Sequence, residues 1–180
     1  MSMHDVNDSG CHPLATDLGR LLLARGWRVA TAESCTGGLV AGAITAVPGS
    51  SDWFERGFVT YSNEAKHEML GVPAELIDKH GAVSEPVAAA MAAGAVANSA
   101  ADCALSVTGV AGPGGGTAAK PVGMVCFGWI ARGIRPRTAT LHLPGDRAAV
   151  RDASVEAALS GLLELIGEVR CSAGLTRAPK

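Results

Sequence analysis

The feature that most limits the possible folds is a nearly continuous apolar run at residues 103–110, Cys-Ala-Leu-Ser-Val-Thr-Gly-Val. Its length is that of a β-strand. A strand with one face in water alternates apolar and polar residues, whereas a strand covered on both faces is apolar almost throughout. The run therefore predicts a strand between two layers. Hydrophobic residues make up 48% of the 180 residues and charged residues 18%, which is enough apolar material to fill a core.

Helical and strand patterns alternate along the rest of the chain. Leu14, Leu18, Leu21 and Leu22 recur at helical spacing before Gly26, which is typical of a helix that ends there. Helices are expected at 14–25, 39–46, 63–70, 74–79, 85–99 and 147–169, and strands at 27–31, 57–61, 103–110, 122–130 and 137–143. The last two strands are close enough in sequence to pair as an antiparallel hairpin. The pattern predicts a three-layer α/β/α domain at 13–170 with a mixed, mostly parallel sheet, a disordered leader at 1–12 and a flexible tail at 171–180.

One polar turn stands out. Thr31–Gly38 reads Thr-Ala-Glu-Ser-Cys-Thr-Gly-Gly and lies between an apolar run and a segment with few polar residues. That order predicts a strand, a tight turn and a helix. The first N–H groups of a helix lack partners and favour a negative oxygen, and the glycines let a ligand approach the backbone. An ordinary capped helix start explains the same residues.

Two further polar clusters also follow apolar runs. They are Tyr61–Lys66 (Tyr-Ser-Asn-Glu-Ala-Lys) and Thr108–Thr117 (Thr-Gly-Val-Ala-Gly-Pro-Gly-Gly-Gly-Thr). In open α/β sheets, binding sites lie at the carboxyl ends of the strands. We therefore expect the three clusters to meet at one edge of the sheet.

Nucleophilic catalysis needs a hydroxyl with a neighbouring base, and a turn at a helix start supplies N–H donors for an oxyanion. Ser34 is the candidate hydroxyl. The five histidines stand in no recognisable pattern, so Lys66, in the first turn of its helix, is the candidate base. Burial and the helix N-terminus would lower the pKa of its amine, whereas a solvated Lys66 beside Glu64 would stay charged. Cys35 is an alternative nucleophile, but no base is assigned to it and a packing role is favoured.

The sequence contains no recognisable metal-binding motif and no P-loop motif. The chain has no His-Glu-x-x-His and no Cys or His pairs at ligand spacing. The loop Gly112–Gly116 lacks the Gly-Lys-Ser/Thr of a P-loop; its N–H groups can cradle a phosphate, and a flexible connector is an equally good explanation. Arg147 can pair with a phosphate, although a lone arginine is more often a surface residue.

Seven motifs occur in an order that carries a resemblance. They are Thr31–Gly38, Val47–Ser51, Gly57–Lys66, Leu70–Val72, His80–Ser84, Val107–Gly116 and Lys120–Gly123. Together they resemble the C-terminal domain of the CinA (competence/damage-inducible) family, which includes bacterial nicotinamide mononucleotide deamidases. The resemblance covers nearly all of residues 14–168. Full-length CinA proteins carry an upstream molybdopterin-binding-like domain, and the present chain is expected to be the stand-alone deamidase form without it.

The resemblance implies an amidohydrolase of pyridine nucleotide salvage, which converts nicotinamide mononucleotide to nicotinic acid mononucleotide and ammonia without metal or cofactor. Ser34 would be the nucleophile, Lys66 the base, and Tyr61 a residue that relays or positions the proton. Residues expected to bind the nucleotide are Thr36, Gly37, Gly38, Asn63, Thr108, Gly109, Gly112 and Gly114, with Arg147 as a candidate for the phosphate. The implied fold is of the anticodon-binding-domain-like, CinA-like type, in a homo-oligomer (dimer or higher). The glycine loop carries no acidic residues, so it does not settle the substrate preference.

Two alternatives stay open: a nucleotide-binding or regulatory module with little or no turnover, and an amidase for another small carboxamide. The net charge of −2 offers no basic face for nucleic acid or a membrane surface. No apolar stretch reaches bilayer length, and the N-terminus lacks a secretory signal. A small-molecule nucleotide is therefore the expected partner, with no nucleic acid and no membrane, and the cytoplasm the expected compartment.

Overall fold

The computed structural model describes residues 12–168, and the predicted tail and all of the predicted leader except His12 lie outside this range. The helices are α1 (Pro13–Arg25), α2 (Leu39–Thr45), the 3-10 turn η1 (Ser50–Asp52), α3 (Asn63–Leu70), α4 (Ala74–His80), α5 (Glu85–Ala97) and α6 (Arg147–Gly167). The strands are β1 (Val29–Glu33), β2 (Phe54–Val59), β3 (Cys103–Gly109), β4 (Met124–Ala131) and β5 (Ile134–His142). Within residues 12–168, every helix is too short or too polar to cross a bilayer.

The five strands form one sheet in the order β2-β1-β3-β4-β5. Strand β1 pairs in parallel with both β2 and β3, and β4 pairs antiparallel with β3 and β5. Four strands therefore run in one direction and only β4 opposes them. The mixed sheet with a terminal hairpin is confirmed. Because β1, β2 and β3 are parallel neighbours, the turns that follow these three strands leave the same edge of the sheet.

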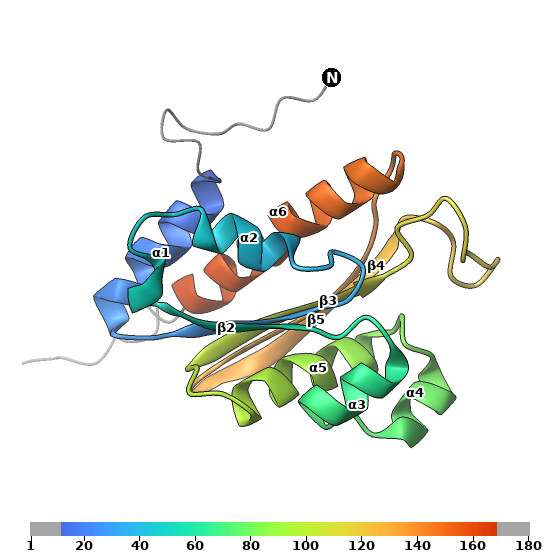
Figure 1. Cartoon of the computed structure of the whole chain (residues 1–180), viewed down its shortest axis with the longest axis horizontal. Coiled ribbons are helices and arrows are strands. Elements are labelled where there is room, and N and C mark those ends of the chain that lie inside the picture. The colour runs from blue at the N-terminus through green and yellow to red at the C-terminus, as the bar shows by residue number, and fades with distance from the viewer. Residues whose placement is uncertain (1–11, 169–180) are drawn as a thin grey trace, which may run out of the picture.

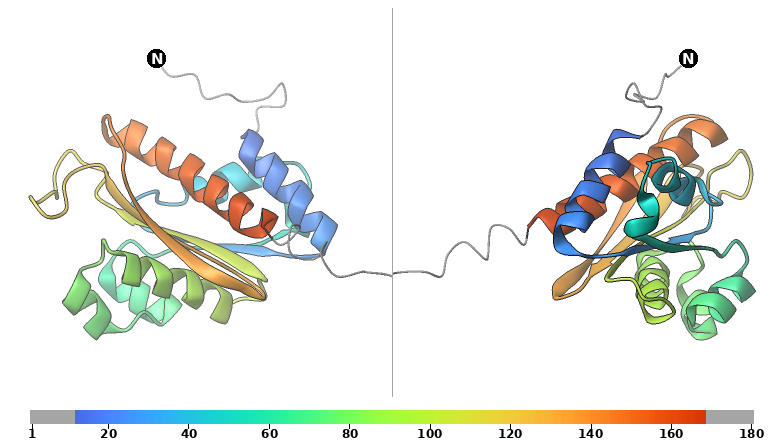
Figure 2. Two further views of the ribbon diagram at one scale, coloured as in Figure 1. Left: turned by 180° about the vertical axis from the view of Figure 1, so that it is seen from behind. Right: turned by 60° about the vertical axis from the view of Figure 1, so that its left-hand side comes forward.

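Helices cover both faces of the sheet, which confirms the three-layer α/β/α fold (Figure 1). One layer holds α1, α2 and α6, and the other holds α3, α4 and α5 (Figure 2). Each layer has its own apolar core: Leu18, Ile44 and Leu162 belong to the first, and Ile77 and Met91 to the second. Strand β3 is buried from residue 103 to 108, as its apolar sequence predicts for a strand inside two layers.

Two glycines allow close packing, one between α6 and the sheet and the other between α5 and the end of α3. A Cβ on Gly161 of α6 would lie 2.3 Å from the ring of Trp129 on β4, and a Cβ on Gly94 of α5 would lie 2.0 Å from the carbonyl oxygen of Leu70. The indole Nε1 of Trp129 donates to the carbonyl of Ala158 at 2.8 Å. Gly161 thus lets α6 pack closely on the sheet, and the first turn of the same helix carries Arg147.

Two strands differ from their predicted positions. Strand β1 spans Val29–Glu33, two residues later than predicted, because Trp27 lies outside it under the guanidinium of Arg25. Strand β2 spans Phe54–Val59, three residues earlier at its start and two earlier at its end. The polar residue Glu33, predicted to lie in the turn, is therefore the last residue of an interior strand and is fully buried.

Candidate active site

Ser34 is the first residue after β1. Its N–H donates to the carbonyl of Val107 on β3 at 2.9 Å, so the main chain still follows the sheet at this point. On the other side of β1, the N–H of Thr60 donates to the carbonyl of Glu33 at 2.8 Å. The Ser34 side chain is thereby held between the ends of β2 and β3, and only 9% of the residue is exposed.

The amine of Lys66 lies beside that hydroxyl. Its Nζ is 3.2 Å from Ser34 Oγ and donates to the carbonyl of Thr60 at 2.9 Å, with longer contacts of 3.4 Å to the carbonyls of Tyr61 and Ser62. Ser62 caps α3, its Oγ accepting the N–H of Ala65 at 3.0 Å. This cap starts the helix so that Lys66, in its first turn, points back to the sheet edge. The Ser34–Lys66 contact joins the first two polar clusters, as expected from the parallel strand order.

Burial favours the neutral form of this amine. Lys66 is 1% exposed, and the loss of water around it lowers the pKa of its amine below the usual value, against smaller opposing effects of Cys35 and Glu64. A neutral amine has two donors and one lone pair. It can donate to the surrounding carbonyls and accept the proton of Ser34 Oγ. The environment resolves the alternatives left open by the sequence: Lys66 is not a solvated surface ion.

Glu33 occupies the start of α2. One carboxylate oxygen accepts from Thr36 Oγ1, Gly38 N and Val40 N at 2.8–3.0 Å, and the other accepts from Ala41 N at 2.8 Å and Thr31 Oγ1 at 3.2 Å. A carboxylate is well suited to the positive end of a helix. The expectation of free N–H groups at this helix start for a ligand is therefore wrong for Gly38 and the first turn of α2, because a side chain of the protein already binds them.

Two N–H groups of the turn are bound by no oxygen of the described residues and face the sulfur of Cys35 instead. Within residues 12–168, the N–H groups of Cys35 and Thr36 donate to no oxygen, whereas that of Gly37 donates to the Ser34 carbonyl. Both lie near the Cys35 sulfur, and burial raises the pKa of this thiol to about 11. A thiol with such a pKa is protonated at neutral pH and is a poor nucleophile. This agrees with the packing role favoured for Cys35.

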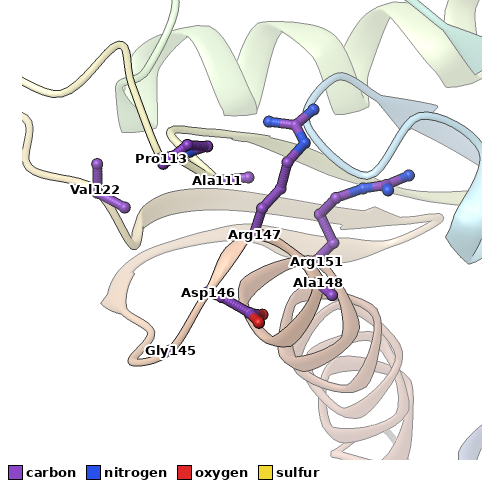
Figure 3. Close-up of a pocket in the computed structure, with 8 residues that line it drawn as sticks. All are labelled: Ala111, Pro113, Val122, Gly145, Asp146, Arg147, Ala148 and Arg151. Atoms are coloured by element: carbon purple, nitrogen blue, oxygen red, sulfur yellow. The ribbon is translucent and has the colours of Figure 1, made fainter.

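A cavity of about 640 Å³ opens beside this turn. Its lining comes from the glycine loop, the segment before α6 and the first turns of α6: Ala111, Pro113, Val122, Gly145, Asp146, Arg147, Ala148 and Arg151. Arg147 and Arg151 leave α6 on the same side, and the carboxylate of Asp146 points away from them (Figure 3). That carboxylate caps α6 through the N–H of Ala149 at 2.9 Å. The cavity therefore presents apolar walls and two cationic groups.

Each arginine links the cavity to another polar cluster. Arg147 donates from Nη1 to the carbonyl of Gly112 at 2.8 Å and from Nη2 to the hydroxyl of Tyr61 at 3.1 Å. Arg151 donates from Nη2 to the carbonyl of Thr36 at 2.9 Å. The cavity and the Ser34–Lys66 pair are thus adjacent, although neither Ser34 nor Lys66 lines the cavity itself.

Tyr61 is placed differently from the expectation that its hydroxyl joins the Ser34–Lys66 pair. The residue is 61% exposed, and its hydroxyl pairs with Arg147. Only its main-chain carbonyl contacts Lys66. Its predicted role as a proton relay stays a prediction, and the contact with Arg147 associates the hydroxyl with the cavity.

The other predicted binding residues fall into two groups. Thr36, Gly37 and Gly38 form the Ser34 turn, and Gly112 contacts Arg147. Gly109 packs against Val125, the Thr108 hydroxyl donates to the carbonyl of Ala82 at 2.9 Å, and nothing approaches the position of a Cβ on Gly114. Asn63 lines a separate cavity of about 270 Å³ between α3 and α4. The structure therefore brings together the Ser34 turn, Lys66, Arg147 and Gly112, but places Asn63 apart from that cavity.

Sequence reasoning missed two residues of the site. Glu33 lies in the predicted polar turn, but the structure places it at the end of β1, where its buried carboxylate caps α2. Arg151 belongs to no predicted motif, although its position four residues after Arg147 puts both on one face of a helix.

Comparison with known proteins decides the family. The family model described as "CinA C-terminal domain" matches residues 11–166. The chain belongs to the CinA C-terminal domain family. The resemblance predicted from the seven motifs is confirmed. Within residues 12–168, no three His, Cys, Asp or Glu side chains gather as a metal site would require; that the reaction needs neither metal nor cofactor stays a prediction.

Relatives in this CinA family include stand-alone and longer proteins. Nicotinamide-nucleotide amidohydrolase PncC of Enterobacter agglomerans is 51% identical over 162 residues, covering 89% of this chain and 99% of that protein. A putative competence-damage inducible protein of Symbiobacterium thermophilum is 58% identical over 151 residues, which are 79% of this chain but 35% of that protein. The crystal structure of competence/damage inducible protein CihA of Agrobacterium tumefaciens superposes with a TM-score of 0.85 at 44% identity, covering 92% and 99% of the two chains.

Proposed function

We propose that this protein hydrolyses the carboxamide of nicotinamide mononucleotide to give nicotinic acid mononucleotide and ammonia, with Ser34 as nucleophile and Lys66 as general base. The observation that carries the proposal is the buried contact of 3.2 Å between Lys66 Nζ and Ser34 Oγ. The name of the relative from Enterobacter agglomerans, nicotinamide-nucleotide amidohydrolase, supports the substrate.

The proposed reaction has two halves. Neutral Lys66 takes the proton of Ser34 Oγ while this oxygen attacks the carboxamide carbon, and the N–H groups of Cys35 and Thr36 hold the oxyanion. The Lys66 ammonium then protonates the amide nitrogen, the C–N bond breaks and ammonia leaves. In the second half, Lys66 takes a proton from water, whose oxygen attacks the acyl carbon. The ester bond to Ser34 Oγ breaks, Oγ regains a proton from Lys66, and nicotinic acid mononucleotide is released.

The cavity beside the turn suits the rest of the nucleotide. We assign the phosphate to Arg147, because a guanidinium binds phosphate oxygens through two parallel N–H donors. Tyr61 lies next to this arginine and would contact the same end of the substrate. The apolar wall formed by Ala111, Pro113 and Val122 would cover the sugar and the pyridine ring between the phosphate and Ser34.

The test is ammonia release from nicotinamide mononucleotide by the purified protein, with chromatography of the acid product. Ser34→Ala is expected to abolish release, whereas Ser51→Ala, which removes an exposed hydroxyl in η1, is expected to leave it unchanged. Absence of release above the Ser34→Ala level would refute the proposed activity. Tight nucleotide binding without turnover would then support a regulatory module, and release from free nicotinamide alone would support an amidase for another small carboxamide.

The assembly, partners and location of the protein are also proposals. A homo-oligomer, the absence of a nucleic-acid partner and a cytoplasmic location fit a small-molecule enzyme of this type. Sedimentation of the purified chain would test the first of these directly.

A further inference from the structure

Arg151 touches the nucleophile turn and the cavity at once. It lies one helical turn after Arg147 on α6 and is half-buried. Its Nη2 donates to the carbonyl of Thr36 and lies 3.6 Å from the position of a Cβ on Gly37. Thr36 is two residues from Ser34, and its N–H is one of the two candidate oxyanion donors. A shift of this guanidinium would therefore move the part of the chain that sets the geometry of attack.

The two arginines differ in their unused donors. Each terminal nitrogen of Arg147 donates one N–H, to Gly112 or to Tyr61, and keeps a second N–H for a phosphate oxygen. In contrast, Nε of Arg151 is buried and has no partner among residues 12–168. Buried donors are nearly always paired in folded proteins. Because this nitrogen is closed to water, an anionic oxygen that entered the cavity would pair with it after the guanidinium turned to expose it.

We propose that Arg151 is a positioning residue that makes turnover depend on the phosphate of the substrate. In this arrangement, a phosphate oxygen accepts from Arg151, the guanidinium is held against the Thr36 carbonyl, and the turn carrying Ser34 is fixed in its reactive geometry. The proposal rests on the proposed function and extends it, because the phosphate then raises kcat in addition to lowering KM. The side chain must hold two acceptors in a fixed geometry, which suits the planar fork of arginine better than a lysine ammonium, whose three donors rotate at the end of a flexible stem.

The test pairs three proteins with two substrates. Wild type, Arg151→Lys and Arg135→Ala are assayed with nicotinamide mononucleotide and with nicotinamide riboside, which lacks the phosphate. Arg135 is exposed in β5 at the opposite end of the sheet, so its variant is the control for loss of a surface arginine. For Arg151→Lys, kcat on the mononucleotide is expected to fall about 10- to 100-fold, the range for loss of one charge-assisted hydrogen bond. On the riboside, kcat should change less than about threefold.

Several results would overturn the proposal. Equal losses of kcat on both substrates would show that Arg151 only supports the fold of the turn. A change in KM without a change in kcat would reduce it to a binding residue, and no change at all would remove it from the site. The Arg135→Ala control is expected to match wild type on both substrates.

A second measurement separates this proposal from the proposed function. Hydrogen exchange of the peptide covering residues 31–38 is followed with and without inorganic phosphate. Phosphate is expected to slow exchange in wild type and in Arg135→Ala but not in Arg151→Lys. If wild type released no ammonia from either substrate, the proposed function would fail and this measurement alone would decide: protection lost in Arg151→Lys supports the coupling, and equal or absent protection in all three proteins refutes it.

Discussion

Replacing Glu33 by glutamine should cost much of the stability of the domain. The carboxylate is fully buried and accepts five hydrogen bonds, three on one oxygen and two on the other. Glutamine keeps one acceptor oxygen and introduces an NH₂ group, which can only donate. If the oxygen keeps the three-donor side, the NH₂ group faces the N–H of Ala41. The hydroxyl of Thr31 can rotate to accept instead, but a main-chain N–H cannot.

The magnitude follows from that mismatch. One buried N–H without an acceptor costs about 1–3 kcal/mol, and the remaining bonds lose the contribution of the negative charge. We expect Glu33→Gln to lower the free energy of unfolding by about 3 kcal/mol, a large part of the 5–15 kcal/mol of a typical domain. At this chain length, the loss corresponds to a fall in Tm of about 6–12 °C.

Urea unfolding followed by circular dichroism measures this loss. Glu164→Gln is the matched control, because the Glu164 side chain is 64% exposed and surface substitutions usually stay within about 0.5 kcal/mol. If the free energy of unfolding of Glu33→Gln were less than about 1 kcal/mol below that of wild type, the role given to the carboxylate at the start of α2 would be refuted.

Three further predictions concern the site and the core. Burial lowers the pKa of Lys66 below 10.5, so kcat/KM should rise with pH through this lowered pKa and level off before the pKa of a free lysine. Between these two pKa values the unfolded chain binds the proton more readily than the folded protein does. The free energy of unfolding should therefore also rise with pH over this interval, relative to that of Lys66→Met. Cys35→Ala should keep ammonia release within about threefold and cost about 1 kcal/mol in urea unfolding, whereas loss of turnover would point to the thiol. Gly42→Ala, in an exposed helical position with open space around its Cβ, should raise the free energy of unfolding by about 0.5–1 kcal/mol. Gly161→Ala should lower it by about 1–3 kcal/mol, because the added Cβ meets Trp129. Calorimetry on both variants shows whether the two changes have opposite signs.

Much of the fold follows from local sequence patterns. The leucine spacing of α1 and the glycine at its end, Gly26, predict the bounds of that helix to within one residue. The apolar run at 103–110 predicts the bounds of β3 equally well. The boundaries of β1 and β2 are less predictable. Glu33 is polar and its sequence places it in a turn, but it is the last residue of β1, where it accepts from Thr31 and from the N–H groups at the start of α2. No local sequence pattern predicts these buried hydrogen bonds of Glu33.

The site divides in the same way. The pairing of Ser34 with Lys66 could be predicted because it follows from strand order. The bond from Arg151 to the Thr36 carbonyl joins residues 115 positions apart, and it depends on how closely α6 packs on the sheet. Tyr61 shows the reverse case: its sequence position is near the pair, but the main chain turns at the Ser62 cap and leaves the phenol outside.

The pairing of β2 has a consequence for how activity fails. Among residues 12–168, β2 pairs only with β1, so Lys66 depends on a strand at the margin of the sheet, while Ser34 follows a strand held on both sides. Marginal strands open at lower free energies than the interior does. Gentle heating or dilute urea should therefore separate the amine from the hydroxyl while most secondary structure persists, and enzyme assays should report damage before any spectroscopic probe of the whole domain does.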